Sequence, residues 1–239
     1  MPYKPARNKA PEKPAAGGRV PSWQVPTDPE PRWLAFGTAV VVIAGQTWVA
    51  NSLSLRPLWV LPAISAVLLV ASLAVYLPDH KEPSLLLRRL SLGLIAVLIV
   101  GNAISVGLLI RGVFLGSGLD PLRLMLTGVV LWIVNTAVFA LAFWEFDSSG
   151  PEARSDGCRE YPDFVFPQQQ QDQKGLAAAD WKPMFVDYFY VSLTAATAFS
   201  PTDTMPYTKR AKLLMAIEST IAFAIAAMLV ARAVNVAKG

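Results

Sequence analysis

The sequence predicts an all-α membrane protein with five transmembrane helices and a re-entrant half-helix before the last of them. Three observations predict this fold class. Of the 239 residues, 54% are hydrophobic and only 16% are charged, against about 25% charged residues in a typical soluble domain. The charged residues lie between long apolar runs, and five of these runs have roughly the 20 residues that cross a ~30 Å hydrocarbon core. Lipid is therefore the expected solvent for most of the chain.

Four of the five apolar runs follow one another, and the fifth comes near the C-terminus. They cover residues 33–53, 58–77, 90–110, 122–146 and 213–231. Trp and Tyr gather at the interface between lipid and water, and several runs carry such residues near an end. These residues are Trp33, Trp48, Trp59, Tyr76 and Trp144.

The polar segments divide the chain into four parts. Residues 1–31 are rich in proline and charge and poor in aliphatic side chains, so they cannot bury enough apolar surface to offset ordering, and we expect a disordered tail. Residues 32–146 hold the first four transmembrane helices. Residues 147–182 are polar and predict an extramembrane loop with at most short local structure. Residues 183–239 hold the half-helix, a polar turn and the last transmembrane helix.

The half-helix is predicted from residues 185–200, FVDYFYVSLTAATAFS. This apolar segment is only 16 residues long, which is short for a full crossing and suits a re-entrant helix. The polar turn 201–206, PTDTMP, follows it, and its two prolines interrupt any helix. A sixth crossing by residues 185–200 remains the alternative.

The basic residues predict the orientation. With five crossings, 16 Lys and Arg residues fall on the side of the N-terminus and five on the other; near the span ends the numbers are 11 and five. Since cytoplasmic loops carry the excess of Lys and Arg, the N-terminus is predicted to be cytoplasmic. Six crossings give 15 against six, so charge does not decide between five and six.

Several function classes have no support in the sequence. The single cysteine, Cys158, excludes an intramolecular disulfide, and the single histidine, His80, leaves little for a metal centre. The glycine-rich and catalytic motifs of nucleotide-binding and hydrolytic enzymes are absent. We expect no enzyme activity, no cofactor and no metal. The net charge of +4 is attributed to basic residues that flank spans, not to binding of nucleic acid.

The segment DYFYVSLTAATAFSPTDTMP (187–206), followed by KRAKLLM and an apolar run, resembles the pore helix, filter and inner helix of potassium channels. Over most of its length the chain also resembles an uncharacterised family of bacterial inner-membrane proteins, described as ion-channel-like or of unknown function. FWEFDSSGPEAR (143–154), PDFVFPQ (162–168) and TAFSPTDTMP (197–206) carry this second likeness. The resemblance implies a multi-pass protein of the bacterial inner membrane.

The filter position differs from that of potassium channels. Residues 199–203, FSPTD, stand where VGYGD is expected and contain no glycine, although glycine permits the backbone of a carbonyl-lined filter. We therefore expect no potassium selectivity. With a cytoplasmic N-terminus, the half-helix would also enter from the cytoplasmic face, opposite to potassium channels. Three interpretations stay open: the charge count misleads, the pore-like segment is inverted, or residues 185–200 cross fully.

Two groups of residues are candidates for a functional site. The first group is filter-like and could line water with side-chain oxygens and free carbonyls: Thr194, Thr197, Ser200, Thr202, Asp203 and Thr204. The second group is polar and lies inside apolar runs: Glu218, Asn102 and Asn135, with Gln46. For the two asparagines, hydrogen bonds between helices, worth about 0.6 kcal/mol each, are the favoured interpretation.

Glu218 has two interpretations. A charge at the centre of a membrane helix costs about 2.5–3.5 kcal/mol on insertion scales, so an ionisable residue there is a functional candidate. The alternative is that Glu218 stays neutral or turns back toward the basic residues ~9 Å away along the helix. Glu145, Asp147 and Glu152 form a further acidic group, for which a solvated loop is favoured over a ring at a pore mouth.

The sequence thus predicts an ion-channel-like protein that conducts small cations. One half-helix cannot enclose a pore, so this function requires a homo-oligomer in the lipid bilayer. A non-conducting scaffold or accessory subunit is the alternative.

Overall fold

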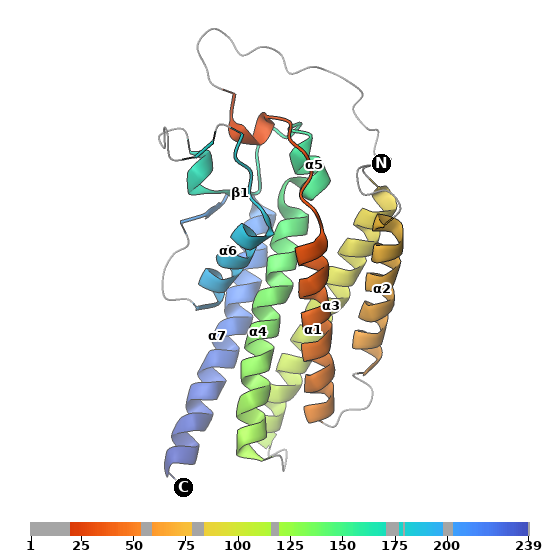
Figure 1. Ribbon diagram of the computed structural model, residues 1–239. Coiled ribbons are helices and arrows are strands. Elements are labelled where there is room, and N and C mark those ends of the chain that lie inside the picture. Colours follow the sequence, from red (N-terminus) through yellow and green to blue (C-terminus); the bar gives the residue numbers. More distant parts are fainter. Residues whose placement is uncertain are drawn as a thin grey trace.

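A computed structural model describes residues 20–53, 59–77, 84–115, 120–170, 177–178, 180–197 and 203–238. Within this part of the chain, five helices form a bundle (Figure 1). They are α1 (Trp33–Ser52), α2 (Val60–Tyr76), α3 (Leu85–Leu115), α4 (Pro121–Phe146) and α7 (Lys209–Lys238). Short elements gather at one end: η1 (Ser22–Gln24), η3 (Asp147–Ser149), α5 (Pro151–Ser155), β1 (Phe164–Val165), η4 (Pro167–Gln169), α6 (Phe185–Thr197) and β2 (Met205–Pro206).

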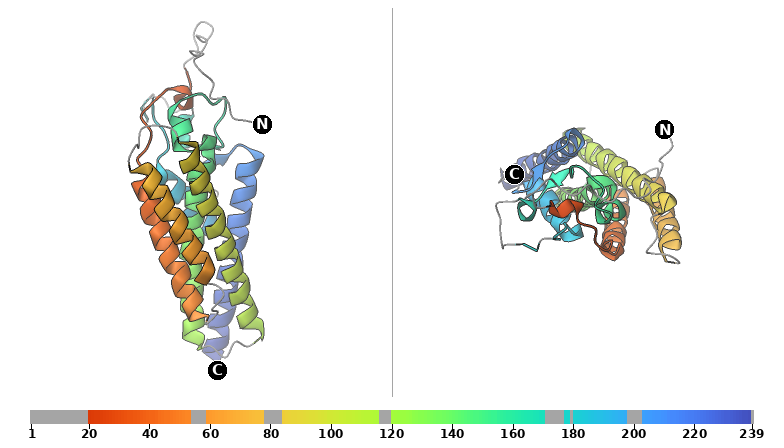
Figure 2. Two further views of the ribbon diagram at one scale, coloured as in Figure 1. Left: turned by 90° about the vertical axis from the view of Figure 1, so that its right-hand side faces the viewer. Right: turned by 90° about the horizontal axis from the view of Figure 1, so that it is seen from above.

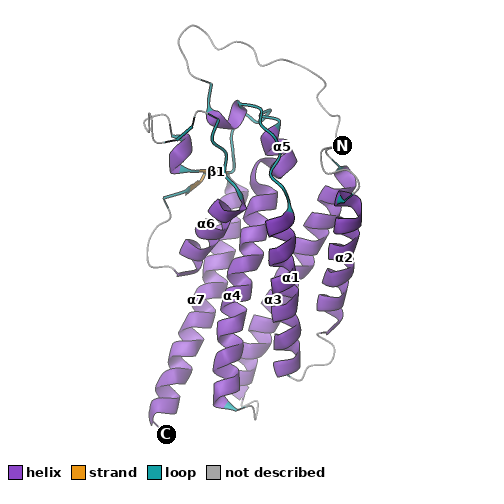
Figure 3. Ribbon diagram, viewed as in Figure 1, coloured by secondary structure: helices purple, strands orange, loops and turns teal. Residues whose placement is uncertain are grey.

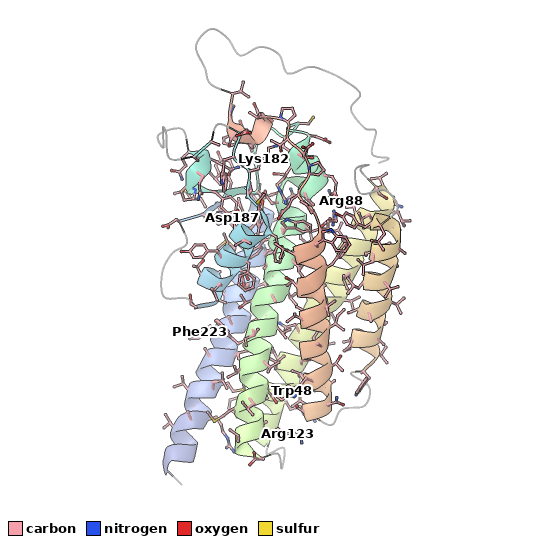
Figure 4. The ribbon with its side chains drawn as sticks, in the orientation of Figure 1. Trp48, Arg88, Arg123, Lys182, Asp187 and Phe223 are labelled. Carbon is pink, nitrogen blue, oxygen red and sulfur yellow. The ribbon has the colours of Figure 1, made fainter. Side chains whose placement is uncertain are left out.

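The molecule is an all-α membrane protein. The helices α1, α3, α4 and α7 are long and apolar enough to cross a membrane, and α2 is an apolar helix of 17 residues. Large apolar side chains cover the outside of the bundle; Val67 is 68% exposed and Phe223 66% (Figure 4). An apolar surface of this extent is costly in water and is what lipid solvates.

Helix α4 is the centre of the bundle. It packs against α1, α3, α6 and α7, and the view from above places it among them (Figure 2). Its second half is buried, including Phe139 and Phe143. Small residues let the neighbouring helices approach, because a Cβ at Gly128 would lie 2.6 Å from a Leu229 side-chain carbon of α7.

The helices alternate in direction. α1, α3 and α7 run away from the end that holds the short elements, and α2 and α4 run toward it (Figure 3). We call this end the cap: the described residues within 20–31, 147–184 and 203–208. The cap includes part of the predicted disordered tail, because the backbone N–H of Thr27 donates to the Ser155 carbonyl at 2.9 Å. Residues 1–19 of that tail lie outside the described part.

Helix α6 begins in the cap and is only 13 residues long. Asp187, the third residue of α6 (Figure 4), accepts a hydrogen bond of 2.8 Å from the backbone N–H of Met184, the residue before the helix, as in one half of a capping box. α6 packs against α4 and α7. After residues 198–202, which lie outside the described part and include Ser200 and Thr202, the chain is again in the cap, where β2 pairs antiparallel with β1. The start of α6 and the strand β2 that follows it in the chain therefore both lie in the cap.

Gly157 gives a test of how the cap is held together. Its φ is +65°, and a Cβ there would lie 2.6 Å from the Gln24 carbonyl oxygen, a backbone atom that cannot rotate away. We expect Gly157→Ala to lower the free energy of unfolding by about 1–3 kcal/mol, measured as a lower Tm in detergent. Gly93→Ala is the matched control, because a Cβ at Gly93 meets nothing within 4 Å. Equal Tm values for the two variants would contradict the described cap.

Candidate functional site

Glu218 is fully buried in α7. Its Oε1 is hydrogen-bonded to the Ser192 hydroxyl of α6. Next to it, Ser219 Oγ donates to the Ala195 carbonyl of α6 at 3.2 Å. Among the described residues, no Lys or Arg forms an ion pair with Glu218. The side chain thus meets α6. It does not turn back toward the basic start of α7, which was one of the two forms of the alternative to a functional role.

Two asparagines extend this contact across the bundle. Asn102 Nδ2 of α3 donates to Asn135 Oδ1 of α4 at 2.8 Å, and Asn135 Nδ2 lies 3.4 Å from the Glu218 carbonyl oxygen. Both side chains are fully buried. We call Asn102, Asn135, Glu218 and Ser192 the buried polar chain; it links α3, α4, α7 and α6. Both asparagines therefore make hydrogen bonds between helices, the interpretation that the sequence favours, and the structure shows that one of these bonds joins them to each other.

The buried polar chain has unused acceptor capacity. Glu218 Oε2 and Asn102 Oδ1 are buried and have no hydrogen-bond partner among the described residues. The Gln46 side chain of α1 donates to the Leu98 carbonyl at 2.8 Å, but its Oε1 is also without a described partner. Since the large majority of buried side-chain polar atoms in proteins are hydrogen-bonded, these oxygens suit a hydrogen-bond donor such as a water molecule, and the Glu218 carboxylate can also bind a proton or a cation.

Ser192 is absent from the residues predicted for the site. Its signal is the periodicity of α6, in which Tyr188, Val191, Ser192, Ala195 and Ala196 are buried on one face. This spacing is that of a helix with one buried side. A hydroxyl on that face needs a partner, and this need could have identified Ser192.

The filter-like residues do not gather around Glu218 in the described part. The hydroxyls of Thr194 and Thr197 donate to carbonyls of their own helix, at 2.9 Å from Val191 O and Thr194 O respectively. Asp203 is exposed in the cap, and Thr204 is buried there.

A second polar cluster holds the cap on the bundle, centred on Arg32 at the start of α1. Its guanidinium makes two hydrogen bonds of 2.7 Å to the Glu152 carboxylate, one of 2.9 Å to Glu145 Oε2 and one of 3.2 Å to Ser91 Oγ. It also lies over the Trp144 ring, 5.1 Å from the centroid. The expected solvated loop is wrong for Glu145, which is 1% exposed, like Arg32 at 2%.

The protonation states of this cluster follow from its geometry. Burial acts to lower the pKa of Arg32, but the charges of Glu145 and Glu152 outweigh it and raise that pKa above its usual range. Burial acts to raise the pKa of Glu152, but its hydrogen bonds and ion pair with Arg32 bring that pKa below its ordinary value. The pair of Arg32 and Glu152 is therefore charged.

Asp147 joins α4, the cap and α6. It is fully buried, which again contradicts a solvated loop. Its Oδ1 accepts a hydrogen bond of 2.7 Å from the Asp163 backbone N–H, and its Oδ2 accepts one from the Tyr188 hydroxyl of α6. The chain turns sharply just after it, with positive φ at Ser148, Ser149 and Gly150. FWEFDSSGPEAR thus contains the residues that fasten α6 to the end of α4.

Asp163 fastens the cap to the start of α7. Its carboxylate accepts hydrogen bonds from Arg210 Nε at 2.6 Å and from the Thr208 hydroxyl at 2.5 Å. Burial acts to raise the pKa of Asp163, but its hydrogen bonds with Arg210, Thr208 and the Ser148 backbone lower it below the ordinary value. The return of the chain after α6 is therefore held by a charged carboxylate.

The cap also contains a cavity of about 350 Å³. It lies between residues 27–31, the end of α5 and residues 180–184, with both acidic and basic side chains in its wall. Arg154 closes one side; its Nη1 donates to the carbonyls of Trp144 at 2.6 Å and Asp147 at 3.0 Å. Lys182 donates to the Arg154 carbonyl, and burial, with the charge of Arg154, lowers the pKa of Lys182.

Comparisons of the chain with models of protein families, with curated proteins and with solved structures find no match. The resemblances drawn from residues 143–154, 162–168 and 187–206 therefore stay predictions. Function has to be argued from the buried polar chain and the cap.

Arg32 gives a test of the cap cluster. Arg32→Met removes the ion-pair partner of the buried Glu145, and breaking a buried ion pair in this way costs about 3–5 kcal/mol. We expect a loss of this size in the free energy of unfolding, measured by denaturant titration in mixed micelles. Arg159→Met, at an exposed arginine of the cap, should change it by less than about 0.5 kcal/mol. Similar losses in the two variants would contradict the cluster.

Proposed function

We propose that the protein is an ion-conducting membrane protein in which α1, α2, α3, α4 and α7 cross the bilayer and α6 is a re-entrant half-helix. The length of α6 supports the second part of this proposal. Its 13 residues span about 20 Å at 1.5 Å per residue, against a hydrocarbon core of ~30 Å. The return of the chain to the cap supports it as well, because β2 pairs with β1.

The contact between Glu218 and Ser192 carries the proposal of ion conduction. An ionisable side chain is expensive at membrane depth and marks ion or proton pathways in membrane proteins. Here it is fully buried, it faces the half-helix, and one of its oxygens is without a described partner. The proposed pathway runs along the junction of α6 and α7.

A pore on this pathway needs several copies of the chain. α6 packs against α4 and α7, and its buried residues lie on one face; Val186, Phe189 and Tyr190 are exposed. On α7, Leu213 and Phe223 are also exposed. We propose that these apolar faces meet in a homo-oligomer. The conducted species are small cations, since Glu218 and Asp203 are acidic; potassium selectivity is not expected from residues 199–203.

The orientation follows from the basic residues. In the proposed arrangement the cap is cytoplasmic, because its side of the bundle holds most of the Lys and Arg residues near the span ends. The half-helix then enters from the cytoplasm. The membrane is the bacterial inner membrane if the resemblance in residues 143–154 and 197–206 holds.

A non-conducting scaffold or accessory subunit is the second candidate. The hydroxyls of Thr194 and Thr197 favour it, because both are bonded to carbonyls of their own helix. The cap, held on the bundle by ion pairs, would then serve to contact a partner.

Ion flux into liposomes distinguishes the two candidates. We expect the wild type to pass H⁺, Na⁺ or K⁺ faster than empty vesicles, and Glu218→Gln to lower that flux about tenfold or more, a change of about 1.4 kcal/mol in the barrier. Asp203→Asn tests the polar turn in the same assay. Asp120→Asn is the matched control. Asp120 is the exposed N-cap residue at the start of α4, at the end of the bundle opposite to the cap. Wild-type flux equal to that of empty vesicles would refute conduction.

A further inference from the structure

The contacts of Ser192 constrain the protonation of Glu218. Ser192 Oγ lies 2.7 Å from the Thr136 carbonyl oxygen of α4 and within hydrogen-bonding distance of Glu218 Oε1. A serine hydroxyl has one proton to donate, and a backbone carbonyl can only accept. If the Ser192 proton is donated to Thr136 O, the second short contact requires a proton on the Glu218 carboxyl group.

The charges around Glu218 point the same way. Within the described residues, α7 packs against α3, α4, α6 and β2, and the groups that Glu218 meets are the neutral side chains of Ser192 and, through its carbonyl, Asn135. An ionised carboxylate that is buried without a counter-charge costs several kcal/mol, and such groups take up a proton instead.

Apart from Glu218 itself and the exposed Tyr190 of α6, the titratable and charged groups on these elements lie near helix ends. On the neighbouring helices they are Arg88, Arg89 and Arg111 of α3, Arg123 and Glu145 of α4, and Asp187, Tyr188 and Tyr190 of α6. On α7 itself they are Lys209, Arg210, Lys212, Arg232 and Lys238. Of these, Arg210 is already paired with Asp163, and Glu145 with Arg32.

We propose that Glu218 is a proton-binding site, a neutral carboxylic acid whose O–H donates to Ser192 Oγ while Ser192 donates to the Thr136 carbonyl. This deepens the proposed function and rests on it in one respect: it assigns H⁺ as the cation that passes along the junction of α6 and α7. The protonation state itself is independent of conduction.

The same proton helps to hold the half-helix in place. When the O–H bond of Glu218 breaks and water accepts the proton, the carboxylate needs a donor, and the nearest one is the Ser192 hydroxyl. That hydroxyl then leaves the Thr136 carbonyl, so this hydrogen bond between α6 and α4 is lost, while the bond from Tyr188 to Asp147 remains. Release of the proton therefore weakens the attachment of α6 to α4.

Infrared spectroscopy of the protein in lipid vesicles tests this assignment. At neutral pH, the wild type minus Glu218→Gln difference spectrum should contain the C=O stretch of one carboxylic acid. This band should shift on transfer to D₂O, and it should give way to carboxylate bands as the pH is raised. A difference spectrum with only carboxylate bands at neutral pH would overturn the proposal.

Two serine variants test the partner, and they do not depend on the folding of Glu218→Gln. Ser192→Ala should shift the frequency of the carboxylic acid band, since it removes the described hydrogen-bond partner of the acid. Ser219→Ala should leave the band unchanged. Ser219 is the residue next to Glu218, and its hydroxyl donates to the Ala195 carbonyl of α6 and not to the carboxyl group. An unchanged band in Ser192→Ala would overturn the assigned geometry.

The two proposals fail in different ways. A carboxylic acid band in a protein without ion flux would refute conduction and keep the proton site. Flux of Na⁺ or K⁺ in a protein whose Glu218 is ionised at neutral pH would keep conduction and refute the proton site.

Discussion

A polar group inside a lipid-solvated bundle must find its partner within the protein, because the hydrocarbon offers none. The central helix α4 supplies many of these partners. It provides Asn135 and the Thr136 carbonyl to the buried polar chain and Glu145 to the cap, and Asp147 follows directly after its last residue. α1, α3, α6 and α7 all pack around it. The arrangement of these four helices, and the position of α6 above all, depends on these contacts.

The polar contacts of α4 differ with depth. Near the cap they are charged, with Arg32 and Glu145 as an ion pair, and an unpaired member of such a pair would be strongly destabilising. Deeper in the bundle they are amides and hydroxyls, and the one ionisable group, Glu218, meets only neutral partners among the described residues. The cap thus fixes α6 at its first turn through Tyr188 and Asp147, while Ser192 one turn later is held by bonds that a proton can change.

Much of the helical architecture follows from local properties of the sequence, and the cap does not. The apolar runs predict the long helices closely. Helix α3, from Leu85 to Leu115, is longer than the apolar run 90–110, because it also includes residues before the run, Arg88 and Arg89 among them, and residues after it. The burial of Glu145 depends on Arg32, which is 113 residues away. Composition around Glu145 contains no sign of that partner, so a solvated loop is the natural but wrong expectation. Glu218 is recognisable because a carboxyl group in an apolar run is costly wherever its partner lies. Ser192 is marked in the sequence only by its place on the buried face of α6, and its partners are known only once α7 and α4 are placed beside that face.

The account depends on the hairpin formed by α6 and the return of the chain to the cap. Labelling of single cysteines by a membrane-impermeant reagent, from each side of oriented vesicles, tests this directly. The natural Cys158, exposed in the cap, reports that side in the wild type; Met205→Cys and Val234→Cys, each with Cys158→Ser, report β2 and the end of α7. We expect Cys158 and position 205 to react from one side and position 234 from the other. Reaction of position 205 from the side opposite to Cys158 would show that residues 185–200 cross the membrane, and would contradict the re-entrant half-helix.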